Sequence, residues 1–352
     1  MTSWAKSSLD SLPVILFFNT YSYPLETRAV VLYDAAKNFI VRFFMSKKVL
    51  IATQKPFAEA ARNSMVKMFE EAGLEPAVLE KYEDNAELLS AVSDAAAMVI
   101  RSDKVTKEVL AAAKELKLVV RAGSGYDNVD CAVAKGRGVV VENTPGQNSN
   151  AVAELAFGMM IMMARGNYNG KPGTELKGKK LGIHAYGNVG KLVAELGKGF
   201  GMDVCGFDPF LDQGVFDDNA VECMSCTEDM YSGCDYVSLH IPATPETINS
   251  INYEVLSRLK KGATIINTAR AEVIQEDDLL KIMGERSDIK YASDIAPKNA
   301  DVLMQKFPER VFFTPKKMGA QTLEANYNAG IAAATQIIAF LNKGEILNQV
   351  NS

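Results

Sequence analysis

The sequence contains few of the residues that most often bind metals or form disulfides. Only two histidines, His184 and His240, and five irregularly spaced cysteines occur in its 352 residues. Cys223 and Cys226 form one CxxC pair, but a structural zinc site needs four ligands and no second pair follows. The irregular cysteine spacing also disfavours a disulfide framework. We therefore expect reduced thiols, as in a cytoplasmic protein, and no metal site.

Long apolar runs and an excess of positive charge are also missing. No run approaches the ~18 apolar residues that a membrane span requires. The net charge of −5 and the pI near 5.4 argue against a general affinity for nucleic acid or anionic membranes. We therefore expect neither a nucleic acid nor a membrane as a partner.

Residues 1–44 differ from the rest of the chain. They contain the only tryptophan, Trp4, and short apolar runs broken by polar residues. A signal peptide is not expected, because a charged leader region and a small-residue cleavage site are both missing. Met45 then begins a strand-like sequence. We therefore expect 1–44 to be an N-terminal appendage, best explained by a start codon assigned too early.

From residue 47 onward, short apolar strands alternate with helical stretches. In the first series, Pro56 and Gly73 mark the two ends of an expected helix, and strands are expected at 49–52, 77–79, 97–100, 118–120 and 139–141. A second alternating series begins after Gly178. An Ala- and Met-rich helix at 151–165 joins the two series, and a helix at about 322–341 closes the chain. Strands separated by helices pair in parallel, so the pattern predicts an α/β fold with two units in tandem.

Residues 185–190, AYGNVG, follow an expected strand and open an expected helix. They fit G-x-G-x-x-G with alanine in the first position. In this context Gly187 would let the backbone approach a pyrophosphate, and Gly190 would let the helix pack on the strand. Asp208, 18 residues beyond Gly190, would bind the ribose diol and favour NAD over NADP. The alternative is an ordinary tight turn. The expected cofactor residues are Tyr186, Gly187, Asn188, Val189, Gly190 and Asp208.

Several ordered motifs together resemble the D-2-hydroxyacid dehydrogenase family. The matching stretches are IRSDKVTKEVL (100–110), VVRAGSGYDNVD (119–130), NTPGQNSNAVAELAFG (143–158), GTELKGKKLGIHAYGNVG (173–190), FGMDVCGFDP (200–209), SLHIPATPET (238–247), IINTARAEVI (265–274) and MGAQTLEA (318–325). The resemblance implies two doubly wound parallel-sheet domains with a cleft between them. A flavodoxin-like substrate-binding domain would comprise 45–144 plus 319–352, and a Rossmann NAD-binding domain 145–318. A homodimer is also implied.

The resemblance also implies roles for individual residues. Arg270 matches the catalytic arginine, whose planar donor fork suits a substrate carboxylate and the neighbouring oxygen. The loop from Arg121 matches the substrate loop, and the arginines at 101 and 121 are the natural phosphate ligands. The implied substrate residues are Arg101, Ser102, Arg121, Gly123, Ser124 and Asn148. The further implied cofactor residues are His240, Thr268, Ala269 and Asp294, of which Asp294 matches the contact to the nicotinamide carboxamide.

The stretch TPKKMGAQT (314–322) departs from the family, which has Pro-His-x-Gly-x-x-Thr there. Counting back from Gly319 places Lys317 in the histidine position, and counting forward from Pro315 places Lys316 there. We favour Lys317. The paired glutamate is also missing, because its position falls near Asn299. Lysine replaces histidine as the acid–base group in one interpretation, and the site is inactive in the other.

The retained arginine and substrate loop favour chemistry over an inactive site. Burial and the positive charge of Arg270 would lower the pKa of a lysine from about 10.4. His240 is the rival acid–base candidate. The expected activity is NAD-dependent oxidation of a phosphorylated 2-hydroxy acid, 3-phospho-D-glycerate. The alternatives are another 2-hydroxyacid dehydrogenase or 2-oxoacid reductase, acting on hydroxypyruvate or glyoxylate, and a non-catalytic NAD(H)-binding scaffold.

Overall fold

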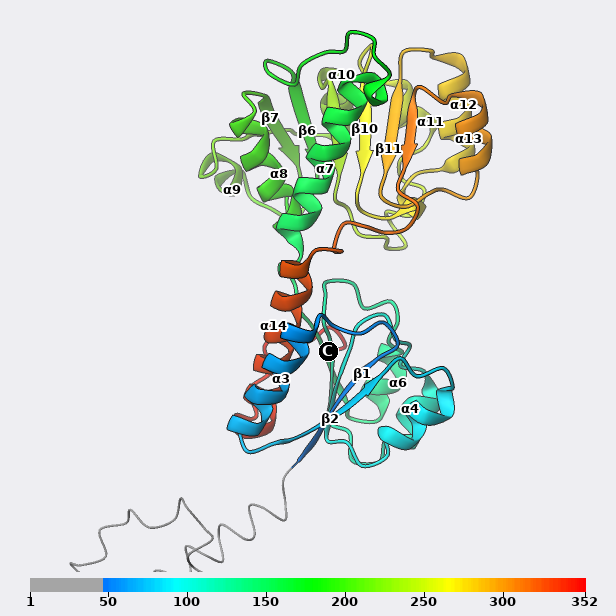
Figure 1. Cartoon of the computed structure of the whole chain (residues 1–352). Helices are drawn as coiled ribbons and strands as arrows, with labels where there is room; N and C mark the ends of the chain where they lie inside the picture. The colour runs from blue at the N-terminus through cyan, green and yellow to red at the C-terminus, as the bar shows by residue number, and fades with distance from the viewer. Residues whose placement is uncertain (1–46) are drawn as a thin grey trace, which may run out of the picture.

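The computed structural model describes residues 47–352, so the expected appendage at 1–44 lies outside the described residues. Two parallel sheets form the frame of two lobes, as Figure 1 shows. Every strand pairing within each sheet is parallel, which confirms the α/β class expected from the alternating pattern. Within the described residues, no helix combines the length and apolar content needed to cross a bilayer.

The first sheet has five strands in the order β2-β1-β3-β4-β5. Its strand order is that of flavodoxin-like folds. Apolar side chains fill both faces, and Ile51 on one strand lies beside Val78 and Val99 on its two neighbours. The strands are β1 (Lys48–Thr53), β2 (Glu75–Glu80), β3 (Ala97–Ile100), β4 (Leu118–Arg121) and β5 (Val140–Asn143), and the helices between them are α3 (Glu59–Glu71), α4 (Asn85–Ala91), α5 (Lys107–Ala112) and α6 (Cys131–Gly136).

Helix α3 begins at Glu59, three residues later than Pro56 led us to expect. The Arg101 guanidinium accounts for the difference. Its Nη1 donates to the carbonyl oxygens of Lys55 and Pro56 at 3.2 and 2.9 Å. These carbonyls therefore bind a side chain from β3, and the first helical bond runs from the Arg62 amide to Ala58.

The second sheet has seven strands in the order β12-β11-β10-β9-β6-β7-β8. The six strands β6 to β11 have the Rossmann order, and β12 is added at the edge beside β11. The strands are β6 (Lys180–His184), β7 (Asp203–Phe207), β8 (Glu222–Cys223), β9 (Tyr236–Leu239), β10 (Thr264–Asn267), β11 (Lys290–Ser293) and β12 (Val311–Phe313). The helices are α8 (Asn188–Gly199), α9 (Gln213–Asp217), α10 (Thr227–Gly233), α11 (Tyr253–Ser257), α12 (Glu276–Glu285) and α13 (Ala300–Lys306).

Two helices connect the lobes (Figure 1). Helix α7 (Ser149–Ala164) leads into the second lobe and packs on α8. Helix α14 (Leu323–Lys343) returns to the first lobe, where Ala333 and Ile337 pack in the core formed by β1, β3 and β4. This packing supports the domain division predicted above, whose boundaries stay a prediction. The carboxyl ends of both sheets carry the loops that form the site described next.

Candidate active site

The loop between β6 and α8 contains two glycines with different surroundings. A Cβ on Gly190 would lie 2.4 Å from the carbonyl oxygen of Ala185, so a side chain cannot be accommodated there. A Cβ on Gly187 would meet no heavy atom within 4 Å. Gly190 is therefore required for packing, whereas Gly187 leaves open space at the first turn of α8. Asn188 and Val189 follow as the first residues of that helix.

Asp208 lies directly after β7 and binds the same loop. Its Oδ2 accepts from the Tyr186 amide at 2.9 Å, and its Oδ1 accepts from the Phe210 amide at 3.0 Å. The side chain of Tyr186 does not contact the cofactor space, because its ring is fully buried and stacks on Phe216 with 4.7 Å between the ring centroids. Only the backbone of Tyr186 can therefore face a ligand in this loop.

The two histidines do not have the surroundings of a proton acceptor. His240 Nε2 lies 2.9 Å from Ser238 Oγ, and its Nδ1 lies 3.4 Å from Thr268 Oγ1. Burial, together with the neighbouring His184, lowers the pKa of His240 to about 3. Burial likewise lowers the pKa of His184 to about 4. A ring with so low a pKa is a weak proton acceptor, and this counts against His240 as the acid–base group.

The loop after β4 is fixed by side chains from the start of α7 and the end of β5. Ser124 donates from Oγ to Asn148 Oδ1 at 3.1 Å, and Asn143 Nδ2 donates to the Ser124 carbonyl at 2.6 Å. Gly123 has φ +141°, a conformation that L side chains rarely adopt. Three of the expected substrate residues, Gly123, Ser124 and Asn148, therefore form one connected structure.

The two expected phosphate ligands are placed differently. The Arg121 guanidinium lies over Gly123, where a Cβ would come within 1.6 Å of its Nη1. Burial lowers the pKa of Arg121 to about 10, opposed by Asp127 and reinforced by Arg270 and Arg101. Arg101 already donates to two carbonyls of the β1–α3 loop and to Asn326 Oδ1 on α14.

Much of the donor capacity of Arg101 therefore serves the structure. Ser102, its neighbour, is exposed. The Arg101 guanidinium carbon also lies 5.2 Å from the centre of the Phe57 ring, which fixes its orientation further.

Arg270 follows β10 and reaches from the second lobe to the first. Its Nη1 donates to the Ala269 carbonyl at 3.0 Å, and its Nη2 lies 3.6 Å from Asp127 Oδ2. Asn267 anchors this turn by accepting from the Ala269 amide at 3.0 Å and donating to the Arg270 carbonyl at 2.9 Å. The guanidinium is thereby held beside the loop after β4.

Lys316 and Lys317 lie in the loop between β12 and α14. The side chain of Lys317 reaches solvent, yet partial desolvation and the charges of Arg270 and Arg121 lower its pKa, opposed by Asp294 and Asp127. Among residues 47–352, Lys317 forms no ion pair within 4 Å. Lys316 is exposed as well. The structure therefore brings Lys317, Arg270 and Arg121 together.

Asp294 holds the loop that carries Lys317. Its carboxylate is buried and accepts from the amides of Met318 and Gly319 at 2.7 and 2.8 Å and from Thr314 Oγ1 at 3.0 Å. These bonds leave one acceptor position on Oδ2, so a nicotinamide contact is compatible with the arrangement. Asn299, in the position of the family glutamate, donates to the Glu276 carbonyl instead. No carboxylate occupies that place.

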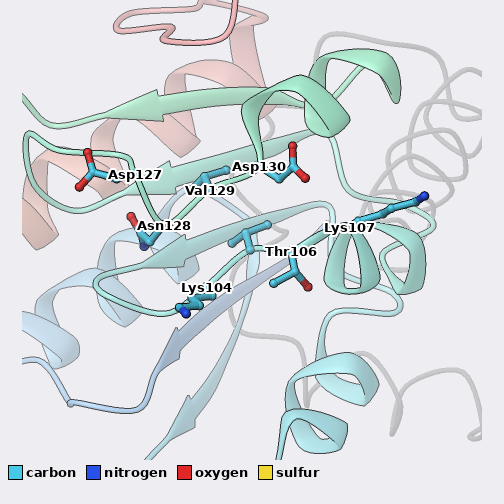
Figure 2. A pocket seen from close by; sticks show the side chains of 8 residues that line it. Lys104, Thr106, Lys107, Asp127, Asn128, Val129 and Asp130 are labelled. Atoms are coloured by element: carbon cyan, nitrogen blue, oxygen red, sulfur yellow. The ribbon is translucent and has the colours of Figure 1, made fainter. Parts of the chain in front are cut away.

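Asp127, Asn128 and Asn326 are residues of the site that the sequence reasoning missed. Asn128 Nδ2 donates to the carbonyls of Arg101 and Asp103 at 3.2 and 2.7 Å, which fixes the end of the loop. The GYDN stretch was visible in the sequence, but its pairing with Arg270 was not. A pocket of about 500 Å³ beside this loop is lined by residues 104–107 and 127–130. Figure 2 shows its side chains, with Asp127 at the opposite end from Lys107.

Comparison with known proteins identifies relatives along most of the chain. Residues 152–315 match the family model described as D-isomer specific 2-hydroxyacid dehydrogenase, NAD binding domain. This match confirms the cofactor expected from the sequence. An NAD⁺-bound 3-phosphoglycerate dehydrogenase from Entamoeba histolytica is similar in structure, with a TM-score of 0.80 and 42% identity, over 87% of this chain and 99% of that one.

Two curated relatives differ in their names. The D-3-phosphoglycerate dehydrogenase of Methanocaldococcus jannaschii is 36% identical over 282 residues, 75% of this chain and 53% of that protein. The hydroxypyruvate reductase of Thermotoga maritima is 34% identical over 280 residues, 74% of this chain and 89% of that protein. The chain spans about half the length of the curated D-3-phosphoglycerate dehydrogenases from Methanocaldococcus jannaschii and Rattus norvegicus, and most of the length of the reductase.

Proposed function

This chain belongs to the family of D-isomer-specific, NAD-dependent 2-hydroxyacid dehydrogenases, and we propose that it oxidises 3-phospho-D-glycerate to 3-phosphohydroxypyruvate, the first step of serine biosynthesis. The observation that carries the proposal is the meeting of Arg121, Arg270 and Lys317 at the junction of the two lobes. A cytoplasmic location and a homodimer, both expected from the sequence, are part of the same proposal.

The residues of the β6–α8 loop fit NAD. The open space at Gly187 lies at the N-terminus of α8, where backbone amides and the helix dipole favour a pyrophosphate. The Asp208 carboxylate is one strand away and would accept from the ribose hydroxyls. When bound, NAD accepts the hydride that leaves C2 of the hydroxy acid.

Arg270 and Lys317 would divide the chemistry at C2. The guanidinium of Arg270 would bind the substrate carboxylate and the C2 oxygen, on which negative charge develops. The neutral amine of Lys317 would take the hydroxyl proton, and in the reverse direction its ammonium form would return it. Desolvation and two neighbouring arginines favour the neutral amine. Residue 299 is an asparagine, so it adds no negative charge that would favour the ammonium form.

The substrate phosphate would bind to an arginine of the first lobe, Arg121 or Arg101. Arg121 is the stronger candidate, because the donor groups of Arg101 are largely used by backbone carbonyls and Asn326. The similarity to a hydroxypyruvate reductase makes reduction of an unphosphorylated 2-oxo acid the second candidate. The positive charge of Arg121 close to Arg270 supports the phosphorylated substrate over it.

A substrate panel with the purified full chain and NAD tests the proposal. We expect 3-phospho-D-glycerate to have a higher kcat/KM than D-glycerate. Arg121→Ala should raise the KM for the phosphorylated acid more than for D-glycerate, since a hydrogen bond to a charged group contributes roughly 1.5–3 kcal/mol. Preference for unphosphorylated acids would favour the reductase alternative. Binding of NAD without turnover of any acid in the panel would favour a scaffold.

The pH dependence tests the role of Lys317. Oxidation requires the neutral amine, so its rate should rise with pH until it passes the lowered pKa of Lys317. Reduction requires the ammonium form and should decline over the same range. Lys317→Ala should lower kcat by roughly 10²–10⁴-fold, whereas the matched control Lys316→Ala should leave it near the wild-type value. Loss in the Lys316 variant instead would place the acid–base group at 316.

A further inference from the structure

A glycine in the substrate loop leaves the room in which Arg270 meets a carboxylate of the other lobe. A Cβ on Gly125 would lie 2.6 Å from Arg270 Nη2 and 3.6 and 3.8 Å from the two carboxylate oxygens of Asp127. Because Gly125 has no side chain, the Arg270–Asp127 ion pair can occupy the space beside it. The pair joins the loop after β10 to the loop after β4, across the junction of the lobes.

Asp127 also acts on the other cations of the site. Its charge opposes the lowering of the pKa of Arg121 and of Lys317. The charged groups that influence Lys317 are Arg270, Arg121, Asp294 and Asp127. Asp294 is buried and holds backbone amides, so Asp127 is the member of this set whose carboxylate is free to move.

We infer that Asp127 is an internal counter-ion of the anion site, which pairs with Arg270 before substrate binds and is displaced by the incoming carboxylate. Nη1 of Arg270 already gives one N–H to the Ala269 carbonyl, so Nη2 is the terminal nitrogen that keeps both of its N–H groups for a substrate carboxylate. Asp127 occupies that end. The substrate therefore binds in competition with a group of the protein itself.

The exposure of Asp127 suits a displaceable partner. Its side chain is 84% exposed, against 28% for Arg270, and the atoms are 3.6 Å apart. Exposed pairs of this kind are weak and screened by salt, so exchange with a ligand is cheap. Asn128 is anchored to the carbonyls of Arg101 and Asp103, and this keeps the neighbouring carboxylate within reach of Arg270. Asp127 would thus set the affinity for anions and not the chemical step.

Removing the Asp127 carboxylate tests this inference in a binding experiment that needs no catalytic turnover. Malonate, an unreactive dicarboxylate, would be titrated into the NAD-bound full chain by calorimetry. Asp127→Asn should bind malonate roughly two- to fivefold more tightly than the wild type, the range expected for loss of an exposed ion pair. Glu115→Gln is the matched control, because it changes the net charge equally from an exposed position before the amino end of β4, whereas the site lies at the carboxyl end of that strand. It should leave malonate affinity unchanged.

A second comparison tests whether the gain in malonate affinity comes from the Arg270–Asp127 ion pair. In an Arg270→Gln background, Asp127→Asn should no longer tighten malonate binding. Unchanged or weaker malonate affinity in Asp127→Asn alone, or an equal gain in Glu115→Gln, would overturn the inference. The inference rests on the proposed function only for the identity of the substrate. Failure to oxidise 3-phospho-D-glycerate would refute the proposed function, while a tighter malonate complex would still support the counter-ion.

Discussion

Two glycine-containing loops lie at the carboxyl ends of the two sheets, and they use their glycines differently. In the β6–α8 loop, Gly187 leaves open space for a ligand. In the loop after β4, the space left by Gly123 and Gly125 is filled by the guanidinium groups of Arg121 and Arg270. The first loop would bind an anion with backbone amides, and the second with arginines of the protein placed over the glycines. A glycine therefore indicates close approach, but not whether a ligand or a side chain approaches.

Among these glycine variants, Gly125→Ala in the loop after β4 should have the largest effect on activity. The new Cβ would displace the flexible end of Arg270, which costs folding little but moves the group that binds the carboxylate. Because misplacement of a catalytic group by about 1 Å can cost ~10²-fold, we expect a loss of that order in kcat/KM with an almost unchanged unfolding midpoint. Wild-type kinetics in this variant would show that Arg270 does not need this place.

Gly190→Ala should act on folding. Its Cβ would lie 2.4 Å from a backbone carbonyl oxygen and 3.1 Å from Ile183 Cγ2, so helix α8 would have to shift from β6. Overpacking of this kind typically costs about 1–3 kcal/mol. Urea denaturation measures the change, and an undiminished free energy of unfolding would contradict the assignment of Gly190 to packing.

Gly187→Ala is the counterpart of Gly190→Ala in the same loop. No heavy atom lies near the new Cβ, and φ at this position is −79°, so folding should be unaffected. A methyl group in the ligand space should weaken NAD binding, by about tenfold, or ~1.4 kcal/mol. Fluorescence titration with NADH would report it. Equal NADH affinity in the variant and the wild type would remove Gly187 from the cofactor site.

Tyr186→Phe should have the smallest effect, and in the stabilising direction. Within the described part of the chain, the buried Tyr186 hydroxyl has no hydrogen-bond partner. Removing an unpaired buried polar group while keeping the ring on Phe216 should raise the free energy of unfolding by up to about 1 kcal/mol. NADH affinity should not change, because only the backbone of Tyr186 faces the loop. A destabilised variant would reveal a partner for the hydroxyl.

Local sequence patterns predicted most of the elements that carry the site. Strand β3 occupies the expected residues 97–100, and α14 begins after the Thr322 cap, close to the expected start. The expected start of α3 was wrong, because Arg101 takes the carbonyls of Lys55 and Pro56. That contact joins residues about 45 positions apart, and the periodicity of a short segment contains no information about it.

The sequence by itself determined the order of strands and helices, the glycine positions of both loops and the lysine in place of a histidine. These features depend on residue type and on neighbours within one turn or strand. Only the tertiary structure decided which glycines stay open, that Tyr186 turns into the core, and that Arg121, Arg270 and Lys317 meet, with Asp127 paired to Arg270. These charges come from separate loops, and the packing of the two sheets and of α14 brings those loops together.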